Sequence, residues 1–343
     1  MIKVAVVGLG WWGKIITKML ATSSRISVIA AVEPNEQEGA AFCKLNQLRY
    51  LNSYALALEQ QDIDAVILTT PNRLHEEQII LAAQAGKHVF CEKPLALTSE
   101  SALKAIHACV ANDVRLGLGH ERRFEPPTLQ LRQLLKQGAL GRLIQIEGNF
   151  SQNKFIGMDP SNWRLSKAEA GCGPMTATGI HLLNLAISLA GPALQVRAHN
   201  FNKITGFESG DSASAQLVFA DGVVGSINAM LSTPFYSRFA VFGSEGWVEV
   251  RDNSHVEAPT GWTFSHCDKN GEITLRNIPA ATPVKDNLEA FAASIDAGQE
   301  NYPISLQEML DTTAALEAVQ LSTERLGQIV TLTALDVQHR QIA

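Results

Sequence analysis

The 343-residue chain lacks several features that point to particular classes of protein. It has no excess of positive charge, because 28 Lys and Arg against 34 Asp and Glu give a formal net charge of −6. This balance argues against a nucleic-acid partner and against binding to an anionic membrane surface. Its five cysteines are scattered and never form a C-x-x-C pair, so they indicate neither a disulfide framework nor a zinc site. We therefore expect free thiols in a reducing cytoplasm and no bound metal.

Long uninterrupted apolar runs are also missing. The apolar start of the chain is broken by glycines and Lys14 before it reaches the length of a signal-peptide core. Residues 174–196 carry no Asp, Glu, Lys or Arg, but they include Gly179, His181 and Asn184, which suit a buried helix better than a membrane span. A content of 46% hydrophobic and 18% charged residues indicates a globular protein. Its length predicts about two domains.

The first third of the chain alternates short apolar runs with segments of helical pattern. The apolar runs are residues 2–7, 28–32, 65–68, 88–91 and 115–118. Such alternation predicts a doubly wound parallel sheet, a Rossmann-type fold, with right-handed connections. We expect this domain to occupy residues 1–122.

A glycine-rich turn follows the first predicted strand directly. Gly8, Gly10 and Gly13 form the pattern G-x-G-x-x-G at the start of a predicted helix. The first glycine permits a tight turn, the second lets a pyrophosphate approach the main chain, and the third lets helix pack on strand. Glu33 ends the second predicted strand, 20 residues after Gly13, and an acid there accepts hydrogen bonds from a ribose 2′-hydroxyl and repels a 2′-phosphate. Together these features predict an NAD site, with NADP less favoured.

A second motif, Glu92-Lys93-Pro94, ends the apolar run of residues 88–91. Ligands of open α/β sheets bind beyond the carboxyl ends of the strands, so Lys93 is expected at a ligand site. Taken alone, such a short motif is more often a surface turn. Its place after a strand of the predicted dinucleotide-binding sheet favours a functional role.

Beyond residue 123 the hydrophobic period changes. Residues 143–150, parts of 214–228 and residues 247–250 alternate apolar and polar side chains, with D-G-type and glycine-rich turns between them. This pattern predicts a large, mostly antiparallel sheet with one open face. Helical patterns follow at residues 286–297 and 306–325. We assign residues 123–343 to a second, α+β domain, whose C-terminal helices are able to pack back on the first.

These motifs together resemble one family, the glucose-fructose oxidoreductase, inositol dehydrogenase and rhizopine catabolism (Gfo/Idh/MocA) group. The resemblance covers nearly the whole chain and rests on the Gly8/Gly10/Gly13 turn, Thr70-Pro71-Asn72 with His75, Gly86-Lys87-His88-Val89 before Glu92-Lys93-Pro94, Arg123-Phe124, Trp163-Arg164 and Gly179-Ile180-His181. It implies a Rossmann domain followed by a substrate-binding domain with a large open sheet. It also implies homodimers or homotetramers formed through that sheet, and oxidation of sugars, polyols or related hydroxy compounds with NAD or NADP.

The resemblance implies roles for individual residues as well. It places Lys93 and His181 at the catalytic centre. The residues implied to hold the cofactor are Gly8, Gly10, Trp11, Trp12, Gly13, Glu33, Thr70, Pro71, Asn72, His75, Glu92 and Lys93. Hydride transfer from an alcohol requires loss of the hydroxyl proton, and histidine titrates near neutral pH. We therefore favour His181 as the base and Lys93 as the donor that polarises the oxygen.

One part of the chain departs from the family pattern. Many family dehydrogenases carry an aspartate four residues before this histidine and another three residues after it, where this chain has Ala177 and Asn184. Thr178 would share a face of a regular helix with His181 and is a candidate partner for its ring. Glu121 is a second candidate replacement. Since a neutral hydroxyl cannot stabilise an imidazolium as a carboxylate does, inositol dehydrogenase activity is less favoured.

The candidate substrate contacts are Lys93, Glu121, Arg122, Arg123, Trp163, Arg164, Thr178 and His181. Arginine forks bind carboxylates through two hydrogen bonds, so an acidic sugar is one hypothesis, although arginines at such positions are more often structural. The main hypothesis is an NAD(P)-dependent dehydrogenase acting on a secondary hydroxyl of a sugar, polyol, sugar acid or cyclic diol. Two alternatives remain open: a non-catalytic NAD-binding sensor or scaffold, and an NAD-dependent glycoside hydrolase of the same family.

Overall fold

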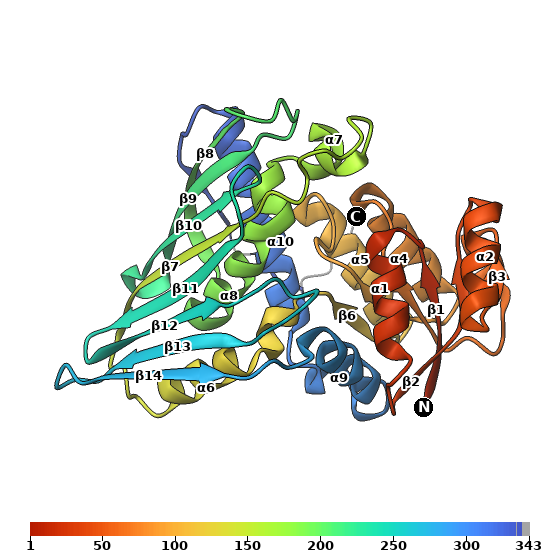
Figure 1. Cartoon of the computed structure of the whole chain (residues 1–343), viewed down its shortest axis with the longest axis horizontal. Helices are drawn as coiled ribbons and strands as arrows, with labels where there is room; N and C mark the ends of the chain where they lie inside the picture. Colours follow the sequence, from red (N-terminus) through yellow and green to blue (C-terminus); the bar gives the residue numbers. More distant parts are fainter. Residues whose placement is uncertain (334, 338–343) are drawn as a thin grey trace. The chain divides into compact units, whose positions relative to one another are not determined.

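The computed structural model describes residues 1–333 and 335–337, which divide into two compact units (Figure 1). The first unit comprises Met1–Glu121 and Pro283–Leu310, together with Val337. The second comprises Arg122–Thr282 and Asp311–Asp336. Both units are discontinuous in sequence, because the chain returns to the first unit after it has built most of the second.

A six-stranded parallel sheet forms the centre of the first unit, in the order β3-β2-β1-β4-β5-β6. Its strands are β1 (Ile2–Val7), β2 (Ile26–Val32), β3 (Arg49–Leu51), β4 (Ala65–Leu68), β5 (His88–Cys91) and β6 (Leu116–Leu118). The direction of sheet growth reverses at β1, which pairs with β2 on one side and with β4 on the other. The carboxyl ends of the strands at such a switch point form the crevice where Rossmann folds bind dinucleotides. The predicted doubly wound sheet is confirmed.

Helices cover this sheet, and one of them comes from far along the chain. They are α1 (Trp11–Leu20), α2 (Glu36–Asn46), α3 (Tyr54–Glu59), α4 (His75–Gln84), α5 (Ser99–Ala111) and α9 (Pro283–Ala297). Phe291 of α9 packs edge-on against Phe90 of β5, with ring centroids 5.7 Å apart. Asn287 of the same helix donates a hydrogen bond to the carbonyl oxygen of Leu118 at 2.9 Å. Helix α9 therefore completes the core of the first unit beside β5 and β6.

A nine-stranded sheet forms the second unit, in the order β14-β13-β12-β11-β7-β10-β9-β8-β15. Its strands are β7 (Leu143–Ser151), β8 (Ala193–Phe201), β9 (Ser212–Phe219), β10 (Val224–Met230), β11 (Tyr236–Gly243), β12 (Gly246–Asp252), β13 (Trp262–Cys267), β14 (Ile273–Ile278) and β15 (Val330–Thr331). Neighbouring strands run antiparallel except β7 and β10, which are parallel. The predicted mostly antiparallel sheet is confirmed.

One face of this sheet is covered by helices (Figure 1). The helices of the second unit are α6 (Pro126–Lys136), α7 (Lys167–Ala170), α8 (Ile180–Ala190) and the later part of α10 (Leu306–Glu324). Short 3-10 turns lie at Asn72–Leu74, Glu121–Phe124, Trp163–Leu165, Ala220–Gly222 and Gln299–Asn301. Along β7, Ile146, Gly148 and Phe150 face the core and α8 residues such as Leu182, whereas Glu147 and Asn149 face the other way. No helix in the described part of the chain is long and apolar enough to cross a membrane.

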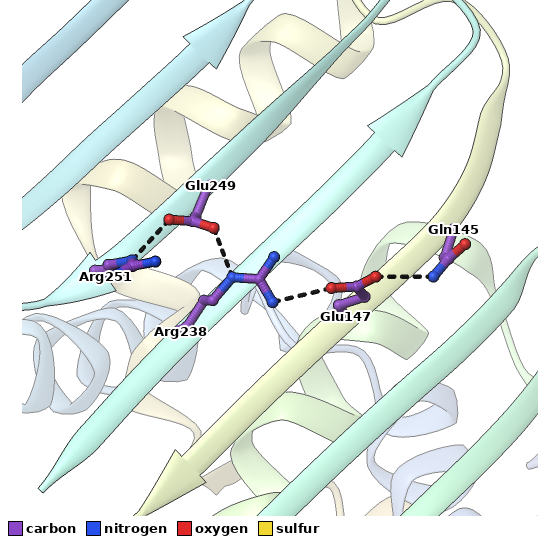
Figure 2. Close-up of polar contacts among 5 residues, drawn as sticks. All are labelled: Gln145, Glu147, Arg238, Glu249 and Arg251. Atoms are coloured by element: carbon purple, nitrogen blue, oxygen red, sulfur yellow. Dashed lines mark hydrogen bonds and ion pairs between the residues drawn. The ribbon is translucent and has the colours of Figure 1, made fainter.

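The opposite face of the sheet, which we call the outer face, carries a ladder of charged side chains (Figure 2). Arg238 of β11 donates from Nε to Glu249 of β12 at 2.5 Å and from Nη1 to Glu147 of β7 at 2.9 Å. The ladder continues to Arg251, whose Nε donates to Glu249 at 2.7 Å, and to Gln145, whose amide donates to Glu147 at 2.9 Å. Charges of alternating sign thus join three adjacent strands across the outer face.

Candidate active site

The glycine-rich turn of the first unit has the geometry that a dinucleotide requires. Gly8 adopts φ +92°, in the left-handed region that favours glycine. A Cβ at Gly13 would lie 2.0 Å from the carbonyl oxygen of Gly8, whereas a Cβ at Gly10 would meet nothing within 4 Å. Helix α1 can therefore start against β1, and the main chain at Gly10 is open to a ligand. Since no side chain caps α1, its first amide groups suit a pyrophosphate.

Glu33 reaches the same turn from the end of β2. Its Oε2 accepts a hydrogen bond from the Leu9 amide at 3.0 Å, and its Oε1 accepts one from the Asn35 amide at 3.1 Å. The Tyr50 hydroxyl donates to the Glu33 carbonyl oxygen at 2.9 Å. The carboxylate thus lies beside the turn, where the corresponding acid of this fold accepts hydrogen bonds from the adenosine ribose. The residues present therefore fit a bound dinucleotide.

The turn after β4 lies against the glycine-rich turn. Thr69 Oγ1 donates to the carbonyl oxygen of Gly8 at 2.6 Å, and Thr70 Oγ1 donates to Gln78 at 2.6 Å. The next two predicted cofactor residues, Pro71 and Asn72, begin the 3-10 turn that leads into α4. This part of the site is close to Gly8, but the individual cofactor contacts stay predictions.

The His75 ring is not exposed in the way that we expected of a residue in direct contact with the cofactor. The ring is 1% exposed, with Nδ1 2.7 Å from the carbonyl oxygen of Pro94 and Nε2 3.1 Å from that of Thr70. Burial lowers the pKa of His75, and the two carbonyl contacts oppose that effect only in part. Because both ring nitrogens face main-chain carbonyls, His75 braces the segment after Lys93 against the turn after β4.

Glu92 is enclosed at the end of β5. The Lys93 amide donates a hydrogen bond to its Oε2 at 3.2 Å, and the Trp12 indole lies close enough to the carboxylate to lower its pKa. A Cβ at Gly119 would lie 2.5 Å from the same oxygen, so the β6 end closes over the carboxyl group. Burial raises the pKa of Glu92 to about 7 against the opposing effect of the Trp12 indole, and the charge of Glu121 adds to the increase. Near neutral pH, Glu92 is therefore present in both protonation states beside Lys93.

Two of these relationships were missed from the sequence. Trp12 was predicted to touch the cofactor, which stays a prediction, but its effect on the pKa of Glu92, which links the glycine-rich turn to the Glu-Lys-Pro segment, was not foreseen. Gly119 was not singled out, although its missing side chain makes room for the Glu92 carboxyl group. Trp11 is half-exposed on the first turn of α1, with its ring centroid 5.4 Å from that of Trp12.

In the second unit, His181 lies at the start of α8 among aromatic side chains. Its imidazole centroid is 6.1 Å from the Phe150 ring, at an interplanar angle of 47°. The centroid of the Phe150 ring also lies 6.2 Å from that of Phe235 and 6.0 Å from that of His255. The guanidinium carbon of Arg122 lies 4.4 Å from the centroid of the same ring. We call these five residues the Phe150 cluster.

The helical spacing that we expected before His181 is wrong. Residues Met175–Gly179 form a π-helical turn, and regular α-helix begins only at Ile180. A π-turn carries more residues per turn than an α-helix, so Thr178 does not share the α-helical face assumed for it. Its hydroxyl lies 2.7 Å from the carbonyl oxygen of Phe150 and 3.0 Å from that of Pro174. Carbonyls only accept, so the single proton of Thr178 is committed to the main chain.

The Arg122 side chain is also not exposed in the way that we expected of a substrate contact. It is 7% exposed, and its Nη2 donates to Asp252 Oδ2 at 2.8 Å and to Ser237 Oγ at 3.0 Å. Glu125 adds a second carboxylate at 3.7 Å. A buried arginine paired in this way holds the unit together and is not available to a ligand carboxylate.

The remaining predicted substrate residues lie in different surroundings. Arg123 and Glu121 are buried, and the charge of Glu121 acts on Glu92 within the first unit. Arg164 places its guanidinium carbon 4.2 Å from the Trp163 ring centroid, and both side chains are partly exposed. A stacked pair of this kind presents donors beside an aromatic face, and its contact with substrate stays a prediction.

The first unit has the features of one class of protein, an oxidoreductase with a dinucleotide-binding Rossmann domain: an open glycine-rich turn, an acid beside it, and a lysine at the end of β5. Residues 2–120 match the family described as "Oxidoreductase family, NAD-binding Rossmann fold", and residues 128–249 match the GFO/IDH/MocA C-terminal domain. The chain belongs to the Gfo/Idh/MocA family of oxidoreductases.

Individual relatives share this organisation. The levoglucosan dehydrogenase of Pseudarthrobacter phenanthrenivorans is 27% identical over 250 residues, which cover 65% of this chain and 64% of that enzyme, just under two thirds of its length. The 1,5-anhydro-D-fructose reductase of Ensifer adhaerens is 29% identical over 273 residues, 78% of this chain and 80% of the relative. The crystal structure of aldose-aldose oxidoreductase from Caulobacter crescentus, complexed with glycerol, superposes with a TM-score of 0.86 at 26% identity, covering 96% of this chain and 99% of that one.

Proposed function

We propose that this oxidoreductase uses NAD to oxidise a secondary hydroxyl of a sugar or polyol, or to reduce the corresponding carbonyl. The observation that carries the proposal is that Lys93 follows the carboxyl end of β5, at the same edge of the parallel sheet as the glycine-rich turn after β1. The dinucleotide-binding turn and the proposed catalytic lysine thus share the edge where such sheets bind their ligands. The relatives named above act, by their names, on sugars or anhydro sugars, which supports this substrate class.

The residues divide the chemistry between them. Bound NAD would supply the hydride acceptor. The main-chain amides after Gly10 and the Glu33 carboxylate hold the dinucleotide at its pyrophosphate and adenosine ribose. The Lys93 ammonium donates a hydrogen bond to the substrate oxygen, and a ring nitrogen of His181 takes the hydroxyl proton as hydride leaves the carbon.

Neutral substrates are favoured over acidic ones. Of the three arginines considered for binding a carboxylate, Arg122 and Arg123 are buried, and Arg122 is paired with Asp252. The Trp163 and Arg164 pair remains, and an indole face with neighbouring donors suits a hydroxyl-rich ring. Loss of activity for anionic substrates alone in Arg164→Ala would reverse this preference.

The test is nicotinamide reduction across a panel of sugars, anhydro sugars, polyols, sugar acids and cyclic diols, with NAD and NADP offered separately. Lys93→Met should lose nearly all activity, while Lys104→Met, a change of an exposed lysine on α5, should keep it. Unchanged turnover in Lys93→Met would refute the proposed role of the lysine. If the wild type reduces no nicotinamide with any compound of the panel while nucleotide stays bound, the alternative of a non-catalytic NAD-binding sensor is favoured. Glycoside cleavage without net formation of NADH would favour the alternative of an NAD-dependent glycoside hydrolase.

We also propose that two copies of the chain associate through the outer face of the nine-stranded sheet, as a homodimer or within a homotetramer. This face exposes apolar side chains, among them Val218, Val224 and Tyr236, around the charged ladder of Figure 2. Apolar groups mixed with charges of both signs suit a self-complementary contact. Sedimentation of Val224→Arg/Tyr236→Arg should show monomers, whereas Leu129→Arg, on α6, should sediment as wild type does.

We place the protein in the cytoplasm. Its five cysteines are all free and buried, which supports a reducing compartment. Localisation of the tagged protein in fractionated cells would test this.

A further inference from the structure

One buried carboxylate organises the loop between β8 and β9, residues 202–210. Asp211, the residue directly before β9, is fully buried. Its Oδ2 accepts hydrogen bonds from the main-chain amides of Lys203 at 3.1 Å, Ile204 at 2.7 Å and Thr205 at 2.9 Å, and from the Thr205 hydroxyl at 3.2 Å. Burial alone would raise the pKa of Asp211, but these hydrogen bonds lower it below its usual value. The charged carboxylate therefore holds three successive amide groups in place.

The far end of this loop carries Ser209, whose main chain is bonded to a second segment, residues 163–173. The Ser209 amide donates to the carbonyl oxygen of Leu165 at 3.2 Å, and the Ser209 carbonyl oxygen accepts from the Gly173 amide at 2.7 Å. Ser209 is fully buried, and a Cβ at Gly173 would overlap its hydroxyl group. Ser209 thus ties together the two ends of this segment.

The segment held by Ser209 contains the Trp163 and Arg164 pair. Both residues lie in the 3-10 turn Trp163–Leu165, and the carbonyl group that Ser209 binds belongs to the next residue, Leu165. The Arg164 guanidinium carbon lies 4.2 Å from the indole centroid. A shift of Leu165 would therefore move the indole and the guanidinium together.

The helix that carries His181 begins beyond this segment and has an attachment of its own. Thr178 lies in the π-turn before α8, and its hydroxyl lies 2.7 Å from the carbonyl oxygen of Phe150 on β7. Strand β7 is held from both sides, by β10 and β11. Loosening residues 163–173 should therefore displace the Trp163 and Arg164 pair more than it displaces His181.

We propose that Asp211 is the positioning residue of the Trp163 and Arg164 pair: it fixes the loop of residues 202–210, and Ser209 of that loop fixes the pair for substrate binding. The inference rests on the proposed contact of this pair with a neutral, hydroxyl-rich substrate. Asp211 is itself fully buried and acts on substrate through the pair. Its effect falls on substrate affinity, because His181, the proposed base, is held from β7.

The first experiment measures hydrogen–deuterium exchange and needs no substrate. Asp211→Asn keeps the size of the side chain but removes its charge, so amides of residues 163–173 should exchange about 10-fold faster or more, while those of β7 should be unchanged. The matched control is Asp268→Asn, since Asp268 also accepts from two main-chain amides, those of Asn270 at 2.9 Å and Glu272 at 3.0 Å. It should leave residues 163–173 unaltered. Equal exchange of this segment in the two variants would overturn the proposal.

The second experiment measures kinetics with the panel compound that has the highest kcat/KM. Asp211→Asn should raise KM roughly 5- to 10-fold with kcat within about threefold of wild type, whereas Asp268→Asn should change neither. Trp163→Ala should raise KM as well, and adding Asp211→Asn to it should raise KM by less than about twofold further, because both changes act on the same contact. Additive increases in KM would show that Asp211 does not act through the pair and would overturn the proposal.

A milder variant keeps the test valid if Asp211→Asn fails to fold. Thr205→Val removes one hydrogen bond to Asp211 from a partly exposed position in the loop. It should raise both KM and the exchange rate of residues 163–173 about threefold. Wild-type values of both would overturn the proposal.

The outcomes also separate this inference from the proposed function. Unchanged KM in Trp163→Ala would refute the proposed substrate contact of the pair. A raised KM in Trp163→Ala, together with an Asp211→Asn that matches Asp268→Asn, would refute only the positioning role. If no panel compound is turned over, the proposed function fails, and the exchange measurement alone decides whether Asp211 positions the pair.

Discussion

The Glu33 carboxylate accepts a hydrogen bond from the main-chain amide of Leu9, 3.0 Å away, and so joins the end of β2 to the glycine-rich turn. The second carboxylate oxygen is held by the Asn35 amide at 3.1 Å. A carboxylate held through both oxygens has a fixed place at the turn where this fold binds the adenosine ribose. It favours a 2′-hydroxyl and disfavours a 2′-phosphate there.

The first prediction concerns this choice of cofactor. Glu33→Gln should lower kcat/KM with NAD and raise it with NADP, so that the ratio of the two changes about 10- to 100-fold, because repulsion of the 2′-phosphate is removed. Steady-state kinetics with both nucleotides measures the ratio. Glu36→Gln, an exposed acid at the start of α2, is the matched control and should leave it unchanged. If the ratio of kcat/KM with NAD to that with NADP is unaltered in Glu33→Gln, the prediction is wrong.

The second prediction concerns Gly119. In Gly119→Ala the new Cβ would lie 2.5 Å from Glu92 Oε2, so the carboxyl group must move away from the Trp12 indole and the Lys93 amide. Because the displaced atoms end a flexible side chain, stability should fall by only about 1 kcal/mol, while kcat should fall about 10-fold or more. Chemical denaturation and kinetics separate the two effects. A variant as active as the wild type would show that the placement of Glu92 does not matter.

The third prediction concerns pH and Glu92. Burial raises the pKa of this carboxyl group from 4.5 to about 7, so the folded protein keeps a proton that the unfolded chain releases. Wild-type stability should therefore decline as pH rises from about 4.5 through about 7, by roughly 3 kcal/mol from this group. Glu92→Gln should lack that decline. The difference between the two proteins in urea unfolding at pH 5, 6, 7 and 8 measures it, and a difference independent of pH would contradict the assignment.

The fourth prediction concerns the charged ladder on the outer face. Burial alone would raise the pKa of Glu249, but hydrogen bonds from Arg238 and Arg251 lower it below its usual value. The stabilisation is therefore present above the unfolded pKa of about 4.5 and is lost as pH falls through the lower folded value. Arg238→Met should destabilise the protein by about 1 kcal/mol at pH 7 and by much less at pH 3.

The matched control for the ladder is Arg197→Met, a change of an exposed arginine on β8, which should be nearly neutral at both pH values. Thermal or urea unfolding at pH 7 and pH 3 gives the comparison. A loss in Arg238→Met that is equal at the two pH values would mean that packing of the arginine stem, and not its charge, stabilises the sheet.

The sequence by itself determined the features that depend on short stretches of chain. The turn after β1 needs glycine at Gly8 and Gly13 because of its φ angle and the contact with the first carbonyl, and such needs are local. The two hydrophobic periods predicted a parallel sheet followed by a mostly antiparallel one, since side-chain direction alternates with the local backbone. Glu33 could be placed near Gly8 because adjacent parallel strands end at the same edge.

Only the tertiary structure decided which polar groups meet. Arg122 pairs with Asp252, 130 residues away, and His75 with the carbonyl group of Pro94, so two residues expected to face ligands are buried in support of others. The π-turn before His181 replaced the regular spacing that local periodicity predicts. These outcomes depend on strand order and on how buried donors find acceptors. Packing settles both across the whole unit, and a single sequence does not record them.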